Sequence, residues 1–370
     1  MVDYPLCTII RSTIGTTEPR FLFIREILSD SGFQVVNITW ARSVSDNSLI
    51  SNSDERRFFR RADYGGGLRN LFSHLSFSVK IYRELRNIKP SLIVACDLDT
   101  LLPSLMWRNR GEAEIYYDQF DPISARLGFL GFGKLFDYLE MRLAMKANFR
   151  STPNLTRVPD IYRGSWIELK NLFEFEPLIP KSSHRDKGRI LFYGGVLGKD
   201  RGLRSAASAV SGKQDWKLQI FGQGPELRSL QSIQSPNLFV NSAIPHNELM
   251  QQAIRSNLYL AMYDPSIKNN RLTASNKLFE AAQLGLPIVA SKNTYLGEVV
   301  ERYRLGWAVT YDDVTELSKL LDDFSALDDS EIEKIRINLS SYYLNEELNQ
   351  RVAITKLEKE LSDTLRRSKE

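Results

Sequence analysis

The sequence contains few cysteines and no long apolar run. Its two cysteines among 370 residues are Cys7 and Cys96, and both fall in segments whose apolar pattern predicts buried strands. We therefore expect small apolar core residues there, and neither a disulfide nor a cysteine metal site. No stretch of about 18 apolar residues occurs, so no membrane-spanning helix is predicted. The opening residues lack a basic segment followed by an apolar core, which argues against a secretory signal peptide and indicates a cytoplasmic setting.

A strong charge of either sign is also absent. Lysine and arginine number 49 against 45 acidic residues, and this balance of +4 is too small to indicate a nucleic-acid-binding protein. The composition, with 42% hydrophobic and 25% charged residues, is that of an ordinary folded protein. A chain of 370 residues is too long for one typical core, and we expect two domains.

No complete Gly-x-Gly-x-x-Gly fingerprint follows a predicted strand, which argues against a dehydrogenase. Residues 6–40 nevertheless have the order strand, loop, helix, strand that opens a Rossmann-type fold. Strands and helices alternate through both halves, which predicts an α/β protein with two parallel-sheet domains. A proline-containing, polar stretch suits the boundary between them. We predict a first domain over residues 1–175 and a second over 176–345, followed by a terminal helix at about 346–370.

The most informative stretch is residues 272–291, which predicts a loop, a helix and a buried strand. Ser275 is a plausible N-cap, and Gly285 is well placed to end the helix. A helix N-terminus with Lys277 in its first turn suits a phosphate, and Glu280 lies one turn further on, within reach of a sugar hydroxyl. The alternative is that Lys277 is a solvated residue and Glu280 only complements the helix dipole.

A second glycine-containing segment follows a predicted strand at residues 189–193. Gly194 and Gly195 lack side chains and let a phosphate approach the backbone, and Arg201 at the next helix start is suited to bind that phosphate. A further turn, Gly-Gln-Gly-Pro, contains Gly224 and follows the next strand. The alternative is a purely structural strand–turn–helix.

The segment NKLFEAAQLGLPIVAS, residues 276–291, resembles the donor-binding segment of GT-B glycosyltransferases, specifically the GT4-like family (glycosyl transferases group 1). The resemblance implies two Rossmann-like domains facing across a cleft, with a C-terminal helix that crosses back to the first. It implies that Glu280 binds the nucleotide ribose, with Ser275 and Asn276 beside the donor. Two positions depart from the family pattern: Leu272 replaces a frequent glutamate, and Val196 replaces a frequent arginine.

The implied activity is transfer of a sugar, with retention, from a nucleotide-diphosphate sugar to a glycan or lipid-linked saccharide, as in surface polysaccharide synthesis. Arg201, Lys277 and the helix dipole would stabilise the leaving diphosphate, so neither a metal nor another cofactor is expected. Two alternatives stay open. One is a metal-dependent transferase that uses Asp97 and Asp99, and the other is an inactive nucleotide-sugar-binding or scaffold protein.

Asp97 and Asp99 follow a predicted buried strand and admit three interpretations. Asp97 caps the helix predicted from about Leu98 to Arg108, or one of the two orients an acceptor hydroxyl, or both hold a divalent metal. We predict that Asp99 is a catalytic residue. The histidines His74 and His246 are expected to be packed, surface or cap-region residues.

Residues 41–66 are predicted to form a long loop, and a basic and aromatic segment begins within it. This combination favours an anionic membrane surface or a polyprenyl-pyrophosphate-linked acceptor, and RNA is a further possibility. The alternative is a solvated loop with no partner. The residues concerned are Arg56, Arg57, Phe58, Phe59, Arg60, Arg61, Tyr64, Arg69 and Phe72.

Overall fold

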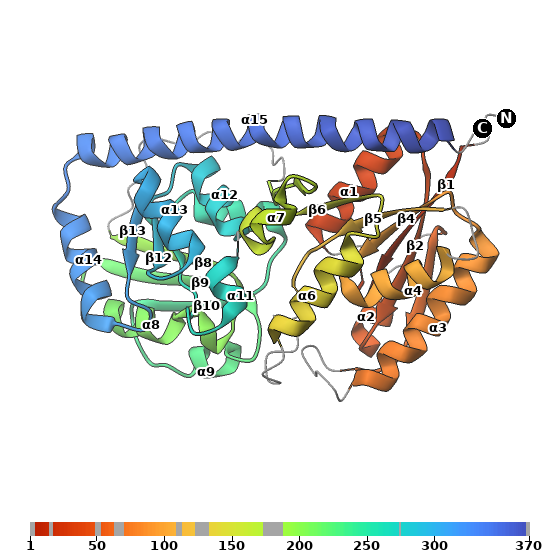
Figure 1. Cartoon of the computed structure of the whole chain (residues 1–370). Coiled ribbons are helices and arrows are strands. Elements are labelled where there is room, and N and C mark those ends of the chain that lie inside the picture. Colours follow the sequence, from red (N-terminus) through yellow and green to blue (C-terminus); the bar gives the residue numbers. More distant parts are fainter. Residues whose placement is uncertain are drawn as a thin grey trace. The chain divides into compact units, whose positions relative to one another are not determined.

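The computed structural model describes residues 4–14, 18–48, 53–62, 70–108, 113–122, 133–172, 188–273 and 275–367. The chain divides into two compact units, which we call unit 1 and unit 2 (Figure 1). Unit 1 comprises residues 1–173 and 350–370, and unit 2 comprises residues 174–349. Each unit is built on its own parallel sheet.

Seven parallel strands form the sheet of unit 1, in the order β3-β2-β1-β4-β5-β6-β7. The order reverses between β1 and β4, and doubly wound sheets bind ligands beyond the strand ends at such a reversal. The strands are β1 (Leu6–Arg11), β2 (Gln34–Ala41), β3 (Glu55–Phe59), β4 (Leu92–Cys96), β5 (Glu114–Asp118), β6 (Phe149–Thr152) and β7 (Ile167–Glu168).

Helices cover both faces of this sheet. Helices α3, α4 and α6 bury one side against the first face, and α1 packs on the other face. Cys7 and Cys96 are buried free thiols in the strands, as predicted, and burial raises the pKa of both. The helices are α1 (Pro19–Asp30), α2 (Val44–Ser48), α3 (Leu71–Ile88), α4 (Leu98–Arg108), α6 (Gly133–Ala144), the 3-10 turn η3 (Leu155–Arg157) and α7 (Asp160–Arg163).

The prediction of one long loop over residues 41–66 was wrong. The described part of this stretch contains α2 and the edge strand β3, which pairs with β2 from Asn37–Glu55 to Ala41–Phe59. A short strand that begins Glu-Arg-Arg lacks the continuous apolar run of a buried strand, because an edge strand keeps part of its surface in solvent.

Unit 2 contains six parallel strands in the order β10-β9-β8-β11-β12-β13. The reversal lies between β8 and β11. The strands are β8 (Arg189–Val196), β9 (Trp216–Gln223), β10 (Leu238–Ser242), β11 (Leu258–Ala261), β12 (Ile288–Ser291) and β13 (Gly306–Val309). Both sheets are parallel and helix-covered, which confirms the predicted α/β class.

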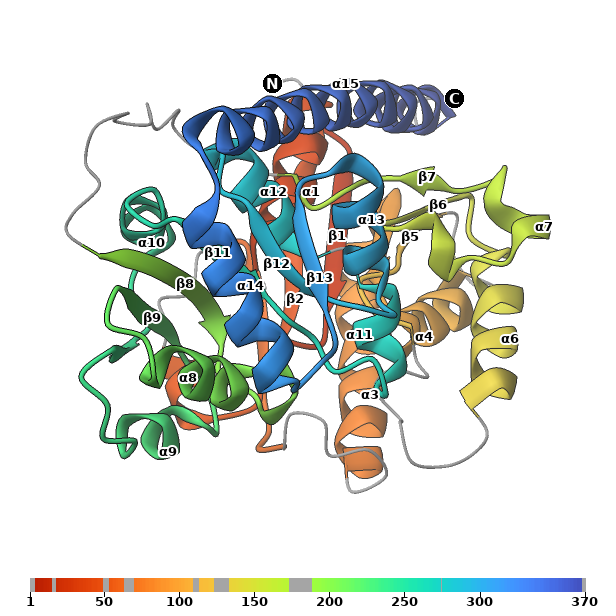
Figure 2. The same ribbon diagram turned by 90° about the vertical axis from the view of Figure 1, so that its left-hand side faces the viewer.

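The helices of unit 2 again lie on both faces of the sheet. Helices α8 and α14 contact each other and share a core with the strands, which includes Trp216 and Phe324 (Figure 2). The helices are the 3-10 turn η4 (Lys199–Arg201), α8 (Leu203–Ser211), α9 (Leu227–Gln231), α10 (His246–Ala253), α11 (Lys268–Leu272), α12 (Asn276–Leu284), α13 (Tyr295–Tyr303) and α14 (Val314–Ala326).

One helix, α15 (Asp329–Arg367), ends the described chain. It begins on unit 2, where Ile332 joins the core, and it ends on unit 1, where Leu357 and Leu361 are buried beside α1. The return to the first domain is therefore confirmed, but the predicted start of the terminal helix near residue 346 was wrong, because α15 begins at Asp329. None of the helices in the described ranges is long and apolar enough to span a bilayer.

Candidate functional site

In unit 2, the C-terminal ends of β8 and β11 meet at the sheet reversal, and β11 is followed along the chain by α11 and then α12. Ser275 caps α12, because its hydroxyl accepts a hydrogen bond from the backbone N–H of Lys277 at 3.2 Å. The same hydroxyl is 2.6 Å from that of Tyr263, which fixes the cap. Gly285 adopts a φ of 64° and ends the helix, as predicted. Asn276, the first residue of α12, is half-buried.

Glu280 is buried at this edge, with only 8% of its surface exposed. Tyr259 donates its hydroxyl to Oε2 at 2.6 Å, and His246 Nε2 hydrogen-bonds with Oε1 at 3.1 Å. Burial works to raise the pKa of Glu280, but the hydrogen bond from His246, the charge of Lys277 and the hydrogen bond from Tyr259 outweigh it and lower the pKa. Glu280 is therefore an ionised, oriented acceptor. His246 is part of this arrangement, which sequence reasoning missed.

Lys277 lies beside the ring of Tyr193, with its ammonium 4.9 Å from the ring centre. Burial works to lower the pKa of Lys277, and the neighbouring Tyr263, Tyr193 and Glu280 outweigh it, so the pKa is raised. The ammonium is therefore charged at neutral pH. A Cβ atom on Gly195, whose φ is 136°, would lie 2.7 Å from this ammonium.

The predicted glycines lie where the ends of β8 and β9 approach each other. Gly224 has a φ of 153°, and a Cβ atom there would lie 2.5 Å from the carbonyl oxygen of Leu197. A Cβ atom on Gly194 would instead meet the flexible end of Leu249 at 2.8 Å. The backbone itself therefore requires glycine at position 224, whereas a side chain at position 194 would meet only the movable end of Leu249.

Arg201 lies at the end of η4 and is held at the same edge of the sheet. Its Nη1 is 2.8 Å from Asp200 Oδ2 and 3.1 Å from Asn270 Oδ1. Its guanidinium lies 4.6 Å from the centre of the Tyr263 ring, and the hydroxyl of that tyrosine bonds with Ser275. Tyr263 thus connects Arg201 to the start of α12. The edge carries two cations, Lys277 and Arg201, beside a helix N-terminus, which is suited to a phosphorylated ligand.

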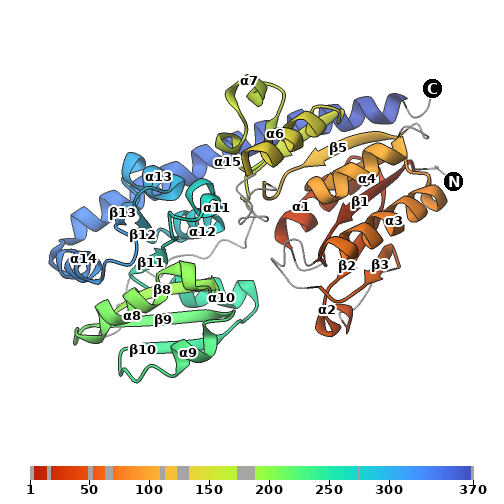
Figure 3. The same cartoon turned by 60° about the horizontal axis from the view of Figure 1, so that its bottom comes forward.

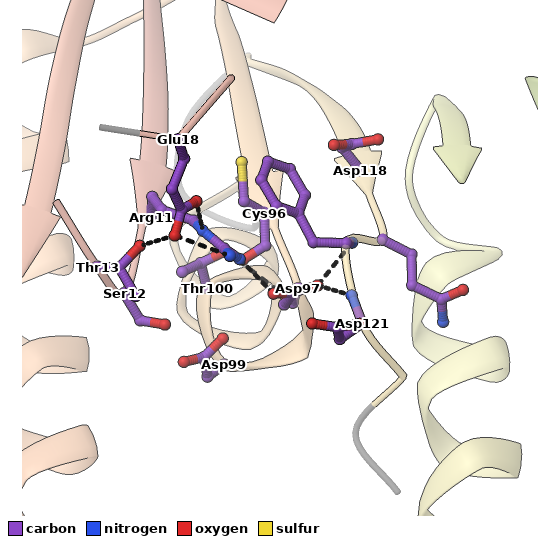
Figure 4. A network of polar contacts seen from close by, with 12 residues as sticks. Arg11, Ser12, Thr13, Glu18, Cys96, Asp97, Asp99, Thr100, Asp118 and Asp121 are labelled. Carbon is purple, nitrogen blue, oxygen red and sulfur yellow. Dashed lines mark hydrogen bonds and ion pairs between the residues drawn. The ribbon is translucent and has the colours of Figure 1, made fainter. Parts of the chain in front are cut away.

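In unit 1, Asp97 lies at the corresponding reversal between β1 and β4 (Figure 4). It is buried, and its φ of 69° is unusual for a residue other than glycine. Its Oδ1 accepts from the backbone N–H of Phe120 at 2.8 Å and of Asp121 at 3.0 Å, and its Oδ2 accepts from Arg11. Both oxygens of Asp97 are therefore bonded within the protein.

These bonds bear on the alternative of a metal held by Asp97 and Asp99. A metal would have to replace Arg11 and two backbone donors at Asp97, so the geometry does not favour the metal interpretation. In the described ranges, no group of three or more His, Cys, Asp or Glu side chains is arranged to hold a metal ion. The nearby Asp118 is equally committed, because Arg20 donates to its two oxygens at 2.5 Å and 2.9 Å.

Asp99 lies in the first turn of α4 and has a different partner. Its Oδ2 is 3.5 Å from Nδ1 of His74, which extends from α3. The His74 ring contacts the Trp40 ring edge-to-face at 5.0 Å. The sequence predicted only a packed or surface role for His74. The structure adds a half-buried His–Asp pair near the strand ends of unit 1.

The basic and aromatic segment does not form a single surface. The side chain of Arg57 is 9% exposed and pairs with Glu55 at 2.7 Å, and Phe58 packs on Trp40 and Phe77. Arg56, Phe59, Arg60 and Arg61 are exposed, as is Phe72 on α3. Tyr64 and Arg69 lie outside the described residues. Because the side chains of β3 point to different sides of the strand, part of the segment packs in the core.

Comparison with known proteins gives a partial family match within unit 2 and a fold for the whole chain. Residues 187–325 match the family of glycosyl transferases group 1. No curated protein sequence matches the chain significantly. The structure is similar to that of sucrose-phosphate synthase from Thermosynechococcus elongatus, with a TM-score of 0.69, 15% identity, and coverage of 96% of this chain and 98% of that one.

Two further solved structures are similar over both units. A lipopolysaccharide outer core galactosyltransferase gives a TM-score of 0.61 at 12% identity, over 95% of this chain and 99% of that one. A spinosyn rhamnosyltransferase solved with thymidine diphosphate gives 0.56 at 12% identity, over 92% and 96% of the two chains. At these identities, the solved structures establish the fold, and the sequence match over residues 187–325 bears on the chemistry.

Proposed function

We propose that this chain, a glycosyltransferase of the GT-B fold, binds a nucleotide-diphosphate sugar at the strand ends of unit 2 and transfers its sugar. The observation that carries the proposal is the convergence of Lys277, Arg201 and the start of α12 beside an ionised, buried Glu280. A diphosphate needs cations and backbone N–H donors, and a ribose needs an oriented acceptor for its hydroxyls.

Each group at the edge has a role in this proposal. The Glu280 carboxylate accepts hydrogen bonds from the ribose hydroxyls, while Tyr259 and His246 keep it ionised and fix its direction. The backbone N–H groups at Ser275 and Asn276 face the diphosphate. We assign Gly194, Gly195 and Gly224 to the donor-binding edge, where the bare backbone of Gly195 lies beside the Lys277 ammonium and lets the ligand approach it.

Lys277 and Arg201 provide the catalytic electrostatics. Negative charge builds on the diphosphate as its bond to the sugar breaks, and fixed cations stabilise this charge without reorganisation. Two cations suffice for this purpose, so the proposal includes no metal or other cofactor. Retention of the anomeric configuration, with attack on the face from which the diphosphate leaves, also belongs to the proposal and rests on the sequence resemblance.

The acceptor side of the proposal rests on unit 1. We assign Asp99, supported by His74 at 3.5 Å, to orient the attacking hydroxyl of a glycan or a polyprenyl-pyrophosphate-linked saccharide. A role in surface polysaccharide synthesis, at the cytoplasmic side of a membrane, fits such an acceptor. The alternative of an inactive nucleotide-sugar-binding protein predicts binding without turnover.

Thermal unfolding with a panel of nucleoside diphosphates tests the donor site. We expect one nucleotide to raise the melting temperature of the wild type, with or without EDTA, and to have no such effect on Glu280→Gln. The matched control is Glu301→Gln, because Glu301 is exposed near the end of α13. No shift with any nucleotide, or an equal shift in Glu280→Gln, would exclude the proposed site. Binding without release of nucleoside diphosphate from any sugar nucleotide would favour the inactive alternative.

A further inference from the structure

The helices α3, α4 and α6 of unit 1 expose an unusual number of large apolar side chains. Phe72 is 74% exposed and Met106 is 61% exposed, values expected of charged surface residues. We call the outward side of these helices, with the turn after α6, the α3–α4–α6 face. Its exposed apolar residues are Phe72, Leu75, Val79, Leu102, Met106, Leu135, Tyr138, Leu139 and Met145.

These side chains belong to one continuous layer. Helix α3 contacts α4, and α4 contacts α6, so the three lie side by side over the sheet (Figure 3). Their inward residues, such as Phe77, Leu105 and Met141, already fill the core against the strands. The outward residues recur at spacings of three and four, which places them along one stripe of each helix. Each helix is thus apolar on two sides, although only one side is buried.

The exposed charged side chains on the described part of this face are all basic. The exposed charged residues on the described parts of the three helices and their C-terminal ends are Arg83, Arg86, Lys89, Arg142 and Lys146. Arg60 joins them, because its guanidinium donates to Ser76 of α3.

None of the acidic residues on the described parts of the same helices is exposed, and Glu140 of α6 is fully buried. Glu84 pairs with Lys80 at 2.5 Å, and Asp99 pairs with His74 at 3.5 Å. Asp137 of α6 is also partly exposed. In unit 2, by contrast, α13 and α14 expose Glu298, Glu301, Asp322 and Asp323. The absence of exposed acids on the described parts of α3, α4 and α6 is therefore not shared by every helix in the protein.

We propose that the α3–α4–α6 face docks on a membrane that carries anionic lipids. The apolar side chains enter the boundary between headgroups and acyl chains, and the arginine and lysine side chains bind the headgroup phosphates. A second copy of the chain fits less well, because a two-fold interface through this face would place cations against cations. The inference deepens the proposed function, since a lipid-linked acceptor is presented at such a surface.

Vesicle co-sedimentation tests the proposal. Wild-type protein is mixed with vesicles of phosphatidylcholine alone or of phosphatidylcholine with phosphatidylglycerol. We expect binding to the anionic vesicles that weakens with salt, and little binding to the neutral ones. Each basic residue near an anionic surface strengthens binding roughly fivefold, so Arg83→Gln/Arg142→Gln is expected to bind roughly 25-fold more weakly. Leu102→Ser/Met106→Ser is expected to weaken binding even at low salt.

Two controls separate this surface from general effects. Ile337→Ser/Leu348→Ser removes equally exposed apolar residues from α15, and Arg302→Gln removes an exposed charge from α13. Both are expected to bind like the wild type, and circular dichroism checks that every variant is folded. The proposal is overturned if anionic vesicles do not bind, if the face variants bind like the controls, or if Leu102→Ser/Met106→Ser instead dissociates a dimer of the wild type.

The outcomes distinguish this proposal from the donor-site proposal. Vesicle binding without any nucleotide effect would support the docking proposal and exclude the donor-site proposal. Nucleotide binding without vesicle binding would support the donor-site proposal and exclude the docking proposal. Neither measurement depends on transfer activity.

Discussion

Replacement of Tyr259 by phenylalanine isolates the hydrogen bond that orients Glu280. The Tyr259 ring is fully buried, and its hydroxyl lies 2.6 Å from Glu280 Oε2. Phenylalanine keeps the ring packing and removes one donor from a buried carboxylate. A hydrogen bond to a charged group contributes about 1.5–3 kcal/mol. We therefore expect Tyr259→Phe to lose about 2 kcal/mol in the free energy of unfolding at neutral pH.

The pH dependence of this loss follows from the lowered pKa of Glu280. A depressed folded-state pKa stabilises the protein above the unfolded-state value, and this stability is lost as the pH falls through the folded-state value. Because Tyr259 contributes to the depression, the difference between wild type and Tyr259→Phe is largest near neutral pH. It shrinks in acid, where Glu280 is protonated in both proteins.

Urea unfolding at neutral and acidic pH measures both effects, and a matched control exists in unit 1. Tyr117 is also buried, and its hydroxyl donates to Glu140 Oε1 at 2.5 Å. Tyr117→Phe is expected to destabilise unit 1 without changing nucleotide binding, whereas Tyr259→Phe weakens both. An unchanged stability of Tyr259→Phe at neutral pH, or an equal loss in acid, would refute the view that Tyr259 holds Glu280 ionised.

Three further predictions concern other parts of the two units. Lys277→Met is expected to weaken the binding of a nucleoside diphosphate at least tenfold and the binding of the nucleoside much less. Equal affinities of wild type and variant for the nucleoside diphosphate, measured by calorimetry, would contradict this. Gly224→Ala is expected to lose about 1–3 kcal/mol of stability, because its Cβ meets a carbonyl oxygen, and an unchanged melting temperature would contradict this. Arg20→Met leaves buried Asp118 without its cationic partner and is expected to cost about 3–5 kcal/mol, and a near-native urea midpoint would argue against it.

Local patterns predicted both ends of α12 well. Ser275 and Gly285 are helix-capping residues. Their hydrogen-bonding and backbone preferences act within a single turn, so both ends of α12 could be predicted from the sequence. The continuity of α15 was missed, although its sequence contains neither glycine nor proline. That absence was the available signal for one uninterrupted helix.

Pairings between distant elements could not be predicted in the same way. His246 and Glu280 come from α10 and α12, and His74 and Asp99 come from α3 and α4. Each pair depends on how helices pack on a sheet, which no local spacing encodes. The exposed apolar face of α3, α4 and α6 could not be predicted for a similar reason. An apolar residue in a helix is assigned to the core until its neighbours in the fold are known.

Release of nucleoside diphosphate from a sugar nucleotide tests the central claim most directly. The assay compares wild type, Lys277→Met and Arg201→Met, with EDTA present throughout. The donor-site account predicts release by the wild type and a rate slower by at least about a hundredfold in each variant, as expected when a group that stabilises the leaving charge is lost. Equal rates in the variants, or release that stops in EDTA and returns with a divalent metal, would contradict it.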